Sequence, residues 1–317
     1  MAIKLSELNL EVVKRDNNDD KYGFDMNNFM DVDNINSNRL ISLPSKLLIS
    51  KNRYIDVLPY SDNRVNLKEI DYINASPIIG EHNHYIVASA PTPPLFGDWW
   101  NMIFEKEVGL VVMLTQEIEG ISIKAHNYIP ESSVKYENII VSCDHSQDKK
   151  FSNTCMSKVI LNSCKEVSVI KYLGWPDHGV PKNLESLKEL FEVYHFEKIK
   201  IYNTPILVHC SAGIGRTGVF LLIDMTLSHI SKSLSSDPLI DIPGTVVKLR
   251  TQRMGMIQTL EQYKLSWKFI NYCVNNNFLT EPSDVFSSSA DESSVLPLAI
   301  YFAIIILLFI FSFFINK

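Results

Sequence analysis

Short apolar runs and longer periodic segments alternate along this chain, and each type predicts its own kind of element. The continuous apolar runs at 109–114 and 206–208 are typical of short strands that are buried on both faces. Residues 184–196 have the spacing of an amphipathic helix, and residues 217–230 predict a mostly apolar helix that follows a glycine-rich turn. A sheet covered by helices accommodates both types, so the pattern predicts an α/β fold.

This pattern continues to about residue 279 and then changes. Neither a low-complexity gap nor an internal repeat interrupts residues 1–279, so we expect them to fold as one domain. Residues 280–294 are rich in serine and acidic residues and poor in large apolar ones. This composition predicts a flexible linker.

The last segment, 295–317, has an apolar character of a different kind. From Leu298 to Ile315 no residue is charged, and the run is long enough to cross the hydrocarbon core of a membrane as a helix. The alternative is a buried C-terminal helix of the domain, but such a helix would carry a polar face and this run carries none. Because residues 1–20 lack an apolar stretch long enough for a signal peptide, we expect a single-pass tail anchor with the domain in the cytosol.

Composition restricts the function further. Hydrophobic residues make up 46% of the 317-residue chain and charged residues 21%, which is the balance of a globular protein. The net charge of −6 argues against binding to nucleic acid, so an anionic ligand must be bound by a local arrangement. Five cysteines without a CxxC pair suggest neither a disulfide framework nor a zinc site, and they favour a reducing compartment. We therefore expect no metal and no cofactor.

A candidate for that local arrangement is the sequence HCSAGIGRTG at 209–218. Cys210 and Arg216 stand at the two ends of a loop of small residues. These residues allow successive backbone N–H groups to turn inward, next to the N-terminus of the following helix, which makes a cradle for an anion. Arg216 adds a bidentate fork for two phosphate oxygens, and the same surroundings favour Cys210 as a nucleophilic thiolate. The residues of the cradle are Ser211, Ala212, Gly213, Ile214 and Gly215.

An isolated cysteine after a strand is more often a buried structural residue, and glycines beside it often serve a tight turn. Arg216 weighs against that interpretation here. An unpaired arginine inside such a loop would be costly without an anion to meet it. The phosphate-binding interpretation is therefore preferred.

The loop resembles the signature of the tyrosine-specific cysteine phosphatases, and four other segments resemble further blocks of that family in the expected order. They are NRYIDVLPY at 52–60, DYINAS at 71–76, GWPDHG at 174–179 and QTLEQ at 258–262. The resemblance implies a single catalytic domain in which helices flank a twisted mixed β-sheet. It also implies hydrolysis of phosphotyrosine in proteins through a cysteinyl-phosphate intermediate.

The resemblance assigns roles to the residues that carry the chemistry. Cys210 is the nucleophile and Arg216 binds the phosphate. Asp177 protonates the phenolic leaving group and later accepts a proton from the attacking water. Gln258, with help from Gln262, aims that water at the intermediate.

Supporting and substrate-binding roles follow from the same resemblance. Tyr54 forms a wall that makes the pocket deep enough for an aryl phosphate only, and Asp56 accepts hydrogen bonds from the backbone of the substrate. Five further residues support the site: His209 behind the thiolate, Thr217 bonded to the sulfur, Trp175 in the mobile lid, and Glu119 and Lys124 in the loop that orients the arginine.

Some positions depart from the family pattern. Ser89-Ala90-Pro91 stands where the family usually has Gln-Gly-Pro, and Ile129-Pro130 stands where a tryptophan usually precedes the proline. Neither departure removes a catalytic group. An alternative function is a catalytically weak pseudophosphatase that binds phosphotyrosine proteins as a membrane-tethered module. A second is a phosphatase with broader or lipid substrates, which would need a shallower or more basic cleft. The arrangement with a C-terminal anchor is similar to that of a family member fixed on the endoplasmic reticulum.

Overall fold

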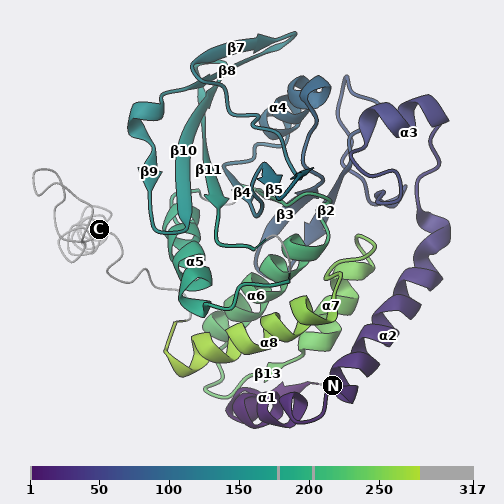
Figure 1. Ribbon diagram of the computed structural model, residues 1–317, viewed down its shortest axis with the longest axis vertical. Coiled ribbons are helices and arrows are strands. Elements are labelled where there is room, and N and C mark those ends of the chain that lie inside the picture. The colour runs from purple at the N-terminus through teal and green to yellow at the C-terminus, as the bar shows by residue number, and fades with distance from the viewer. Residues whose placement is uncertain (1, 177–178, 202–203, 279–317) are drawn as a thin grey trace, which may run out of the picture. The chain divides into compact units, whose positions relative to one another are not determined.

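Nine strands form one mixed β-sheet in the computed structural model, which describes residues 2–176, 179–201 and 204–278 (Figure 1). Along the sheet the order is β2, β3, β12, β4, β11, β10, β8 and β7, and β9 pairs with β10. The bounds are β2 Ala75–Ile79, β3 His84–Ala88, β4 Leu110–Met113, β7 Ser133–Tyr136, β8 Ile139–Cys143, β9 Lys149–Lys150, β10 Thr154–Leu161, β11 Lys165–Tyr172 and β12 Ile206–His209. Two further pairs lie outside this sheet, β1 Ile3–Lys4 with β13 Leu239–Ile240 and β5 Ile118–Glu119 with β6 Ser122–Ile123.

The centre of the sheet is parallel and apolar. Strands β3, β12, β4 and β11 run in the same direction, and their register places Ala88, His209 and Met113 beside one another. Every residue of β4 and β12 is buried, as expected for strands that are covered on both faces. The loops after these strands therefore meet at one edge of the sheet, which is where α/β proteins usually hold their ligands.

Helices cover both faces of the sheet (Figure 1). On one face Trp99 and Trp100 of α4 pack into a core with β-strand residues such as Val111. On the other, Phe191 of α5 stacks on Phe220 of α6 and on Phe269 of α8, with ring centres 4.9 Å and 5.5 Å away. The bounds of the helices are α1 Leu8–Asp16, α2 Asp20–Asn36, α3 Ser45–Lys51, α4 Phe96–Glu105, α5 Leu184–Lys198, α6 Gly215–Lys232, α7 Ile242–Arg250 and α8 Leu260–Asn275.

The elements predicted from the apolar pattern are present. The two predicted strands are β4 and β12, and the two predicted helices are α5 and α6. Helix α6 begins two residues earlier than predicted, at Gly215, because the carbonyl of Ile214 already accepts the first helical hydrogen bond from the N–H of Gly218 at 3.0 Å. The mixed α/β architecture with helices on a mixed sheet is confirmed.

The membrane prediction concerns a part of the chain that the structure does not describe. Within the described residues, every helix is too short or too polar to cross a membrane. The predicted linker at 280–294 and the predicted anchor at 295–317 lie outside the described residues. Both therefore stay predictions.

Candidate active site

The loop between β12 and α6 is held from outside through its carbonyl groups. Four consecutive carbonyl oxygens accept hydrogen bonds from other segments: Ser211 from the N–H of Ala90 at 2.9 Å, Ala212 from the hydroxyl of Ser89 at 2.9 Å, Gly213 from Nε of Arg253 at 3.1 Å, and Ile214 from the N–H of Ile257 at 3.1 Å. In a trans peptide the N–H points away from the carbonyl oxygen of the same unit. The N–H groups of residues 212–215 therefore face the inside of the loop.

Those inward N–H groups make the cradle that the sequence predicts. Among the described residues, none accepts a hydrogen bond from the backbone N–H of residues 212–215. The loop leads directly into α6, so the positive end of the helix dipole lies at the same place. Unpaired N–H groups and a helix N-terminus together form a binding site for an anion.

Gly213 is required by the shape of the loop. Its φ of +72° lies in the left-handed region, and an added Cβ would lie 2.1 Å from the carbonyl oxygen of Ala88. Conformation and space therefore both demand glycine at this position.

Arg253 is the main support of the loop, and the sequence analysis missed it. The side chain is fully buried and donates to the carbonyl of Gly213 at 3.1 Å, to Oγ of Ser76 at 3.1 Å and to Oδ1 of Asn74 at 2.8 Å. Burial lowers the pKa of Arg253 to about 10, so the guanidinium remains charged at neutral pH. The nearby block DYINAS at 71–76 is thus a support for the loop.

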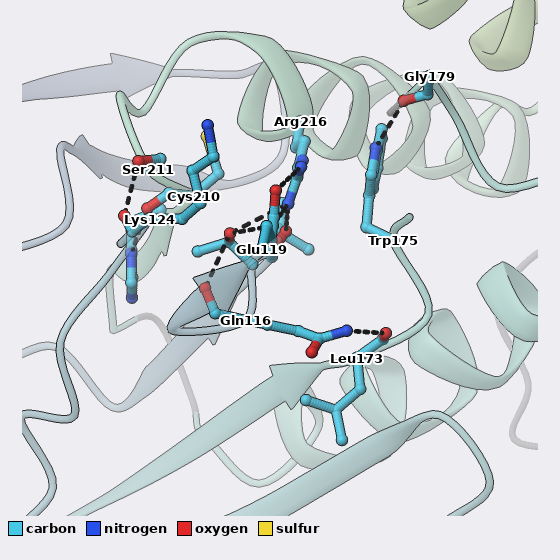
Figure 2. A network of polar contacts seen from close by, with 12 residues as sticks. Gln116, Glu119, Lys124, Leu173, Trp175, Gly179, Cys210, Ser211 and Arg216 are labelled. Carbon is cyan, nitrogen blue, oxygen red and sulfur yellow. Dashed lines mark hydrogen bonds and ion pairs between the residues drawn. The ribbon is translucent and has the colours of Figure 1, made fainter. Parts of the chain in front are cut away.

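Arg216 is fixed by the β5–β6 hairpin (Figure 2). Both of its Nη atoms donate to the carboxylate of Glu119, and Nη1 also lies 3.0 Å from Oγ1 of Thr115. Burial raises the pKa of Glu119, but hydrogen bonds from Arg216 and Thr115 outweigh it and hold that pKa below its ordinary value. An ionised carboxylate is therefore paired with the guanidinium of Arg216.

His209 is the last residue of β12, directly before Cys210, and is fully buried. Its Nδ1 lies 3.0 Å from the carbonyl oxygen of Cys210, and its Nε2 lies 2.8 Å from the hydroxyl of Tyr128. Because a carbonyl only accepts, Nδ1 carries the proton and Nε2 accepts from the hydroxyl. Burial lowers the pKa of His209 to about 4, so the ring is neutral at pH 7. The sequence analysis named His209 but not its partner Tyr128.

Comparison with known sequences agrees with this geometry. The sequence model described as Protein-tyrosine phosphatase matches residues 48–272. The chain belongs to the protein-tyrosine phosphatase family. The matched range contains the cradle, the hairpin that holds Arg216 and the segments that the sequence analysis quoted.

The match with each of three relatives covers only part of that relative's length. The chain is 37% identical to tyrosine-protein phosphatase non-receptor type 20 of Mus musculus over 237 residues, which cover 71% of this chain and 54% of that protein. It is 38% identical to receptor-type tyrosine-protein phosphatase C of Homo sapiens over 234 residues, 68% of this chain and 17% of that protein. It is also 35% identical to phosphatidylinositol phosphatase PTPRQ of Rattus norvegicus over 237 residues, 71% of this chain and 10% of that protein. The chain thus matches about half the length of the non-receptor relatives.

In this member of the protein-tyrosine phosphatase family, Tyr54 contacts the cradle. Its hydroxyl lies 2.8 Å from Oγ of Ser211, which in turn donates to the carbonyl of Lys124 at 2.6 Å. Figure 2 shows Lys124 and Ser211 beside Cys210. Asp56, predicted to bind the substrate backbone, is exposed two residues after Tyr54. The structure thus brings the predicted tyrosine wall and the cradle together.

The two predicted glutamines lie beside the start of α6 and contact each other. The side-chain oxygen of Gln262 accepts from the N–H of Gln258 at 2.9 Å, and an added Cβ at Gly215 would lie 2.8 Å from Nε2 of Gln262. Gln262 is therefore packed on the first turn of α6, whereas the side chain of Gln258 is exposed. Ile257, just before it, has a φ of +63°, which is rare for a β-branched residue and is typical of strained functional segments.

Thr217, Trp175 and Asp177 are the remaining residues that the sequence predicts for the site. Oγ1 of Thr217 is buried and has no hydrogen-bond partner among the described residues. Trp175 is buried; its indole N–H donates to the carbonyl of Gly179 at 3.1 Å, and its ring centre lies 5.5 Å from the guanidinium of Arg216. Asp177, the predicted general acid, lies outside the described residues, so its role stays a prediction.

Proposed function

We propose that this chain is a protein tyrosine phosphatase that forms a covalent phosphate on Cys210. The observation that carries the proposal is the combination of the inward N–H groups at 212–215 with Arg216, which Glu119 holds in a bidentate ion pair. A transferring phosphoryl group spreads its charge over three oxygens. Fixed donors that converge on one point stabilise that charge without reorganising during the reaction.

The reaction follows in two steps. The sulfur of Cys210 attacks phosphorus, the bond from phosphorus to the tyrosine oxygen breaks, and Asp177 gives its proton to that oxygen. Water then attacks the cysteinyl phosphate, Asp177 takes a proton from the water, and inorganic phosphate leaves as the thiolate of Cys210 is restored. Gln258 and Gln262 position the water, and Thr217 donates a hydrogen bond to the departing sulfur.

The substrates of this activity would be phosphotyrosine residues in proteins. Tyr54 supports this choice, because a side chain bonded to Ser211 sets the distance that a phosphate must reach into the cradle. Phosphoserine would fall short of Cys210, and exposed Asp56 would hold the peptide backbone. Trp175 and the lid would close over the bound phosphate and exclude water.

We also propose that residues 295–317 anchor the protein in a membrane, with residues 280–294 as the tether and the catalytic domain in the cytosol. The support is the uncharged apolar run 298–315, whose length suits the hydrocarbon core. The endoplasmic reticulum is the membrane that the resemblance favours.

Phosphate release from a phosphotyrosine peptide and from a phosphoserine peptide tests the catalytic proposal. The full chain in mild detergent should turn over the first peptide only, and Cys210→Ser should lower its kcat by at least about a thousandfold because the nucleophile is lost. Cys164→Ser, which changes an exposed cysteine, serves as the matched control and should keep full activity.

Two other outcomes would replace the proposal. Tight binding of the phosphotyrosine peptide by folded wild-type protein without phosphate release would favour the pseudophosphatase. Because one relative bears the name phosphatidylinositol phosphatase, vesicles that contain phosphoinositides belong in the same assay. Faster turnover of the vesicles than of the peptide would favour the lipid phosphatase.

A further inference from the structure

Three side chains with metal-binding atoms meet where β8 turns toward β9. Strand β8 ends at Cys143, and a 3₁₀ turn at His145–Gln147 links it to β9, which runs in the same direction because both strands pair antiparallel with β10. Nδ1 of His145 lies 3.9 Å from the sulfur of Cys143 and 2.8 Å from Oδ2 of Asp148. One ligand atom from each of the three residues lies within 4.8 Å of the other two. The cluster shares no residue with the proposed active site.

The imidazole of His145 is oriented by its other nitrogen. Nε2 lies 3.0 Å from the carbonyl oxygen of Pro130, and because a carbonyl only accepts, Nε2 carries a proton. Nδ1 is therefore the nitrogen that faces the sulfur and the carboxylate. Histidine ligands of metals are typically held in this way, by a hydrogen bond from the distal nitrogen to a carbonyl or carboxylate.

One acceptor atom of the cluster has no hydrogen bond among the described residues. Oδ1 of Asp148 is buried and has no hydrogen-bond partner among the described residues, which is costly for a carboxylate. A dication among these groups would give Oδ1 of Asp148 a partner. The side chain of His145 is 34% exposed, so an ion can enter from solvent.

We propose that Cys143, His145 and Asp148 form a binding site for a divalent metal of the Zn²⁺ class. One sulfur, one nitrogen and one oxygen donor suit Zn²⁺ and its late first-row neighbours, whereas Mg²⁺ and Ca²⁺ take oxygen ligands. On binding, the thiol of Cys143 and Nδ1 of His145 give up their protons to solvent, because only the deprotonated forms are ligands. Three protein ligands leave a fourth tetrahedral position for water.

Co²⁺ is the probe, since a thiolate bound to it gives a charge-transfer absorption band and tetrahedral coordination gives intense visible bands. The protein is the full chain with Cys210→Ser, which removes the competing thiolate of the active site. We expect one Co²⁺ per chain with both bands, and Zn²⁺ should abolish them by displacement. Adding Cys143→Ser should remove the charge-transfer band, and adding Cys164→Ser, at an exposed cysteine, should leave it unchanged.

A second variant separates a lost ligand from a lost fold. Asp148→Asn keeps the size of the side chain, and it should weaken Co²⁺ binding by about tenfold or more while the far-ultraviolet circular dichroism stays the same. Absence of the bands from the Cys210→Ser protein would overturn the proposal. So would a charge-transfer band that survives Cys143→Ser, or an unchanged affinity in Asp148→Asn.

Discussion

At the scale of single residues, His209 shows how the fold sets the charge next to Cys210. Its ring packs against Trp99 and Tyr128, with ring centres 5.2 Å and 5.5 Å away, and no carboxylate in the described part of the chain contacts it. A charged imidazole in this position would be desolvated without a counter-ion. The neutral ring donates to the carbonyl of Cys210 and adds no positive charge to the site, so the groups that can supply it are the backbone N–H groups, α6 and Arg216.

This neutral histidine predicts a loss of stability in acid. The pKa of His209 is about 4 in the folded protein, and an unfolded histidine has a pKa of about 6.5. Between these values the unfolded state binds more protons, so the free energy of unfolding falls as pH drops from about 6.5 toward 4, by up to about 3 kcal/mol. Above that window His209 contributes no pH dependence. Urea unfolding across it should show a shallower pH slope for His209→Asn than for the wild type, and equal slopes would contradict the assignment.

At the scale of elements, the β5–β6 hairpin connects two parts of the site. Glu119 in β5 holds Arg216, while the carbonyl of Lys124, directly after β6, accepts from Ser211. The hairpin itself has little apolar core, since Ile121 at its turn and Ile118 are exposed. Its position is therefore fixed mainly by polar contacts with the loop that it serves.

Glu119→Gln is expected to lower kcat/KM for a phosphotyrosine peptide by roughly 10- to 100-fold. The amide keeps the shape but loses the charge and one acceptor, so Arg216 is no longer held by a charge-assisted fork. Glu117→Gln is the matched control, because Glu117 pairs with half-buried Lys171 outside the loop and should change kcat/KM less than about twofold. Equal losses in the two variants would mean that the hairpin acts through its fold and not through the ion pair.

Elements and motifs were predictable from the sequence to different degrees. Strands β4 and β12 and helices α5 and α6 follow from local periodicity, and the cradle follows from one continuous motif. Arg253 could not be found in this way, because it reaches Asn74 across 179 positions and neither residue carries a local signal for the contact. The same holds for Tyr128 behind His209, 81 positions away. The spacing of Cys143, His145 and Asp148 resembles no common metal motif, and only the turn after β8 brings them together.

At the scale of the whole molecule, the proposed anchor would restrict which substrates the domain meets. A flexible tether over 280–294 has an expected end-to-end distance of about 20 Å, so the domain would stay close to the membrane surface. The net charge of −6 gives no general electrostatic attraction to an anionic leaflet. Residence at the membrane would therefore depend on the apolar run, and the proteins at that membrane would be the accessible substrates.

Fusion of residues 280–317 to a soluble fluorescent protein tests this dependence without disturbing the domain. We expect the fusion to stay in the membrane fraction after extraction with alkaline carbonate. Leu307→Arg together with Leu308→Arg should release it, because each arginine near the centre of a span costs about 2.5–3.5 kcal/mol in insertion. Ser287→Arg with Ser288→Arg adds the same charge in the tether and should leave the fusion in the membrane. Release of the unmodified fusion by carbonate would contradict the anchor, and retention of the double leucine variant would mean that something other than burial in hydrocarbon holds the segment.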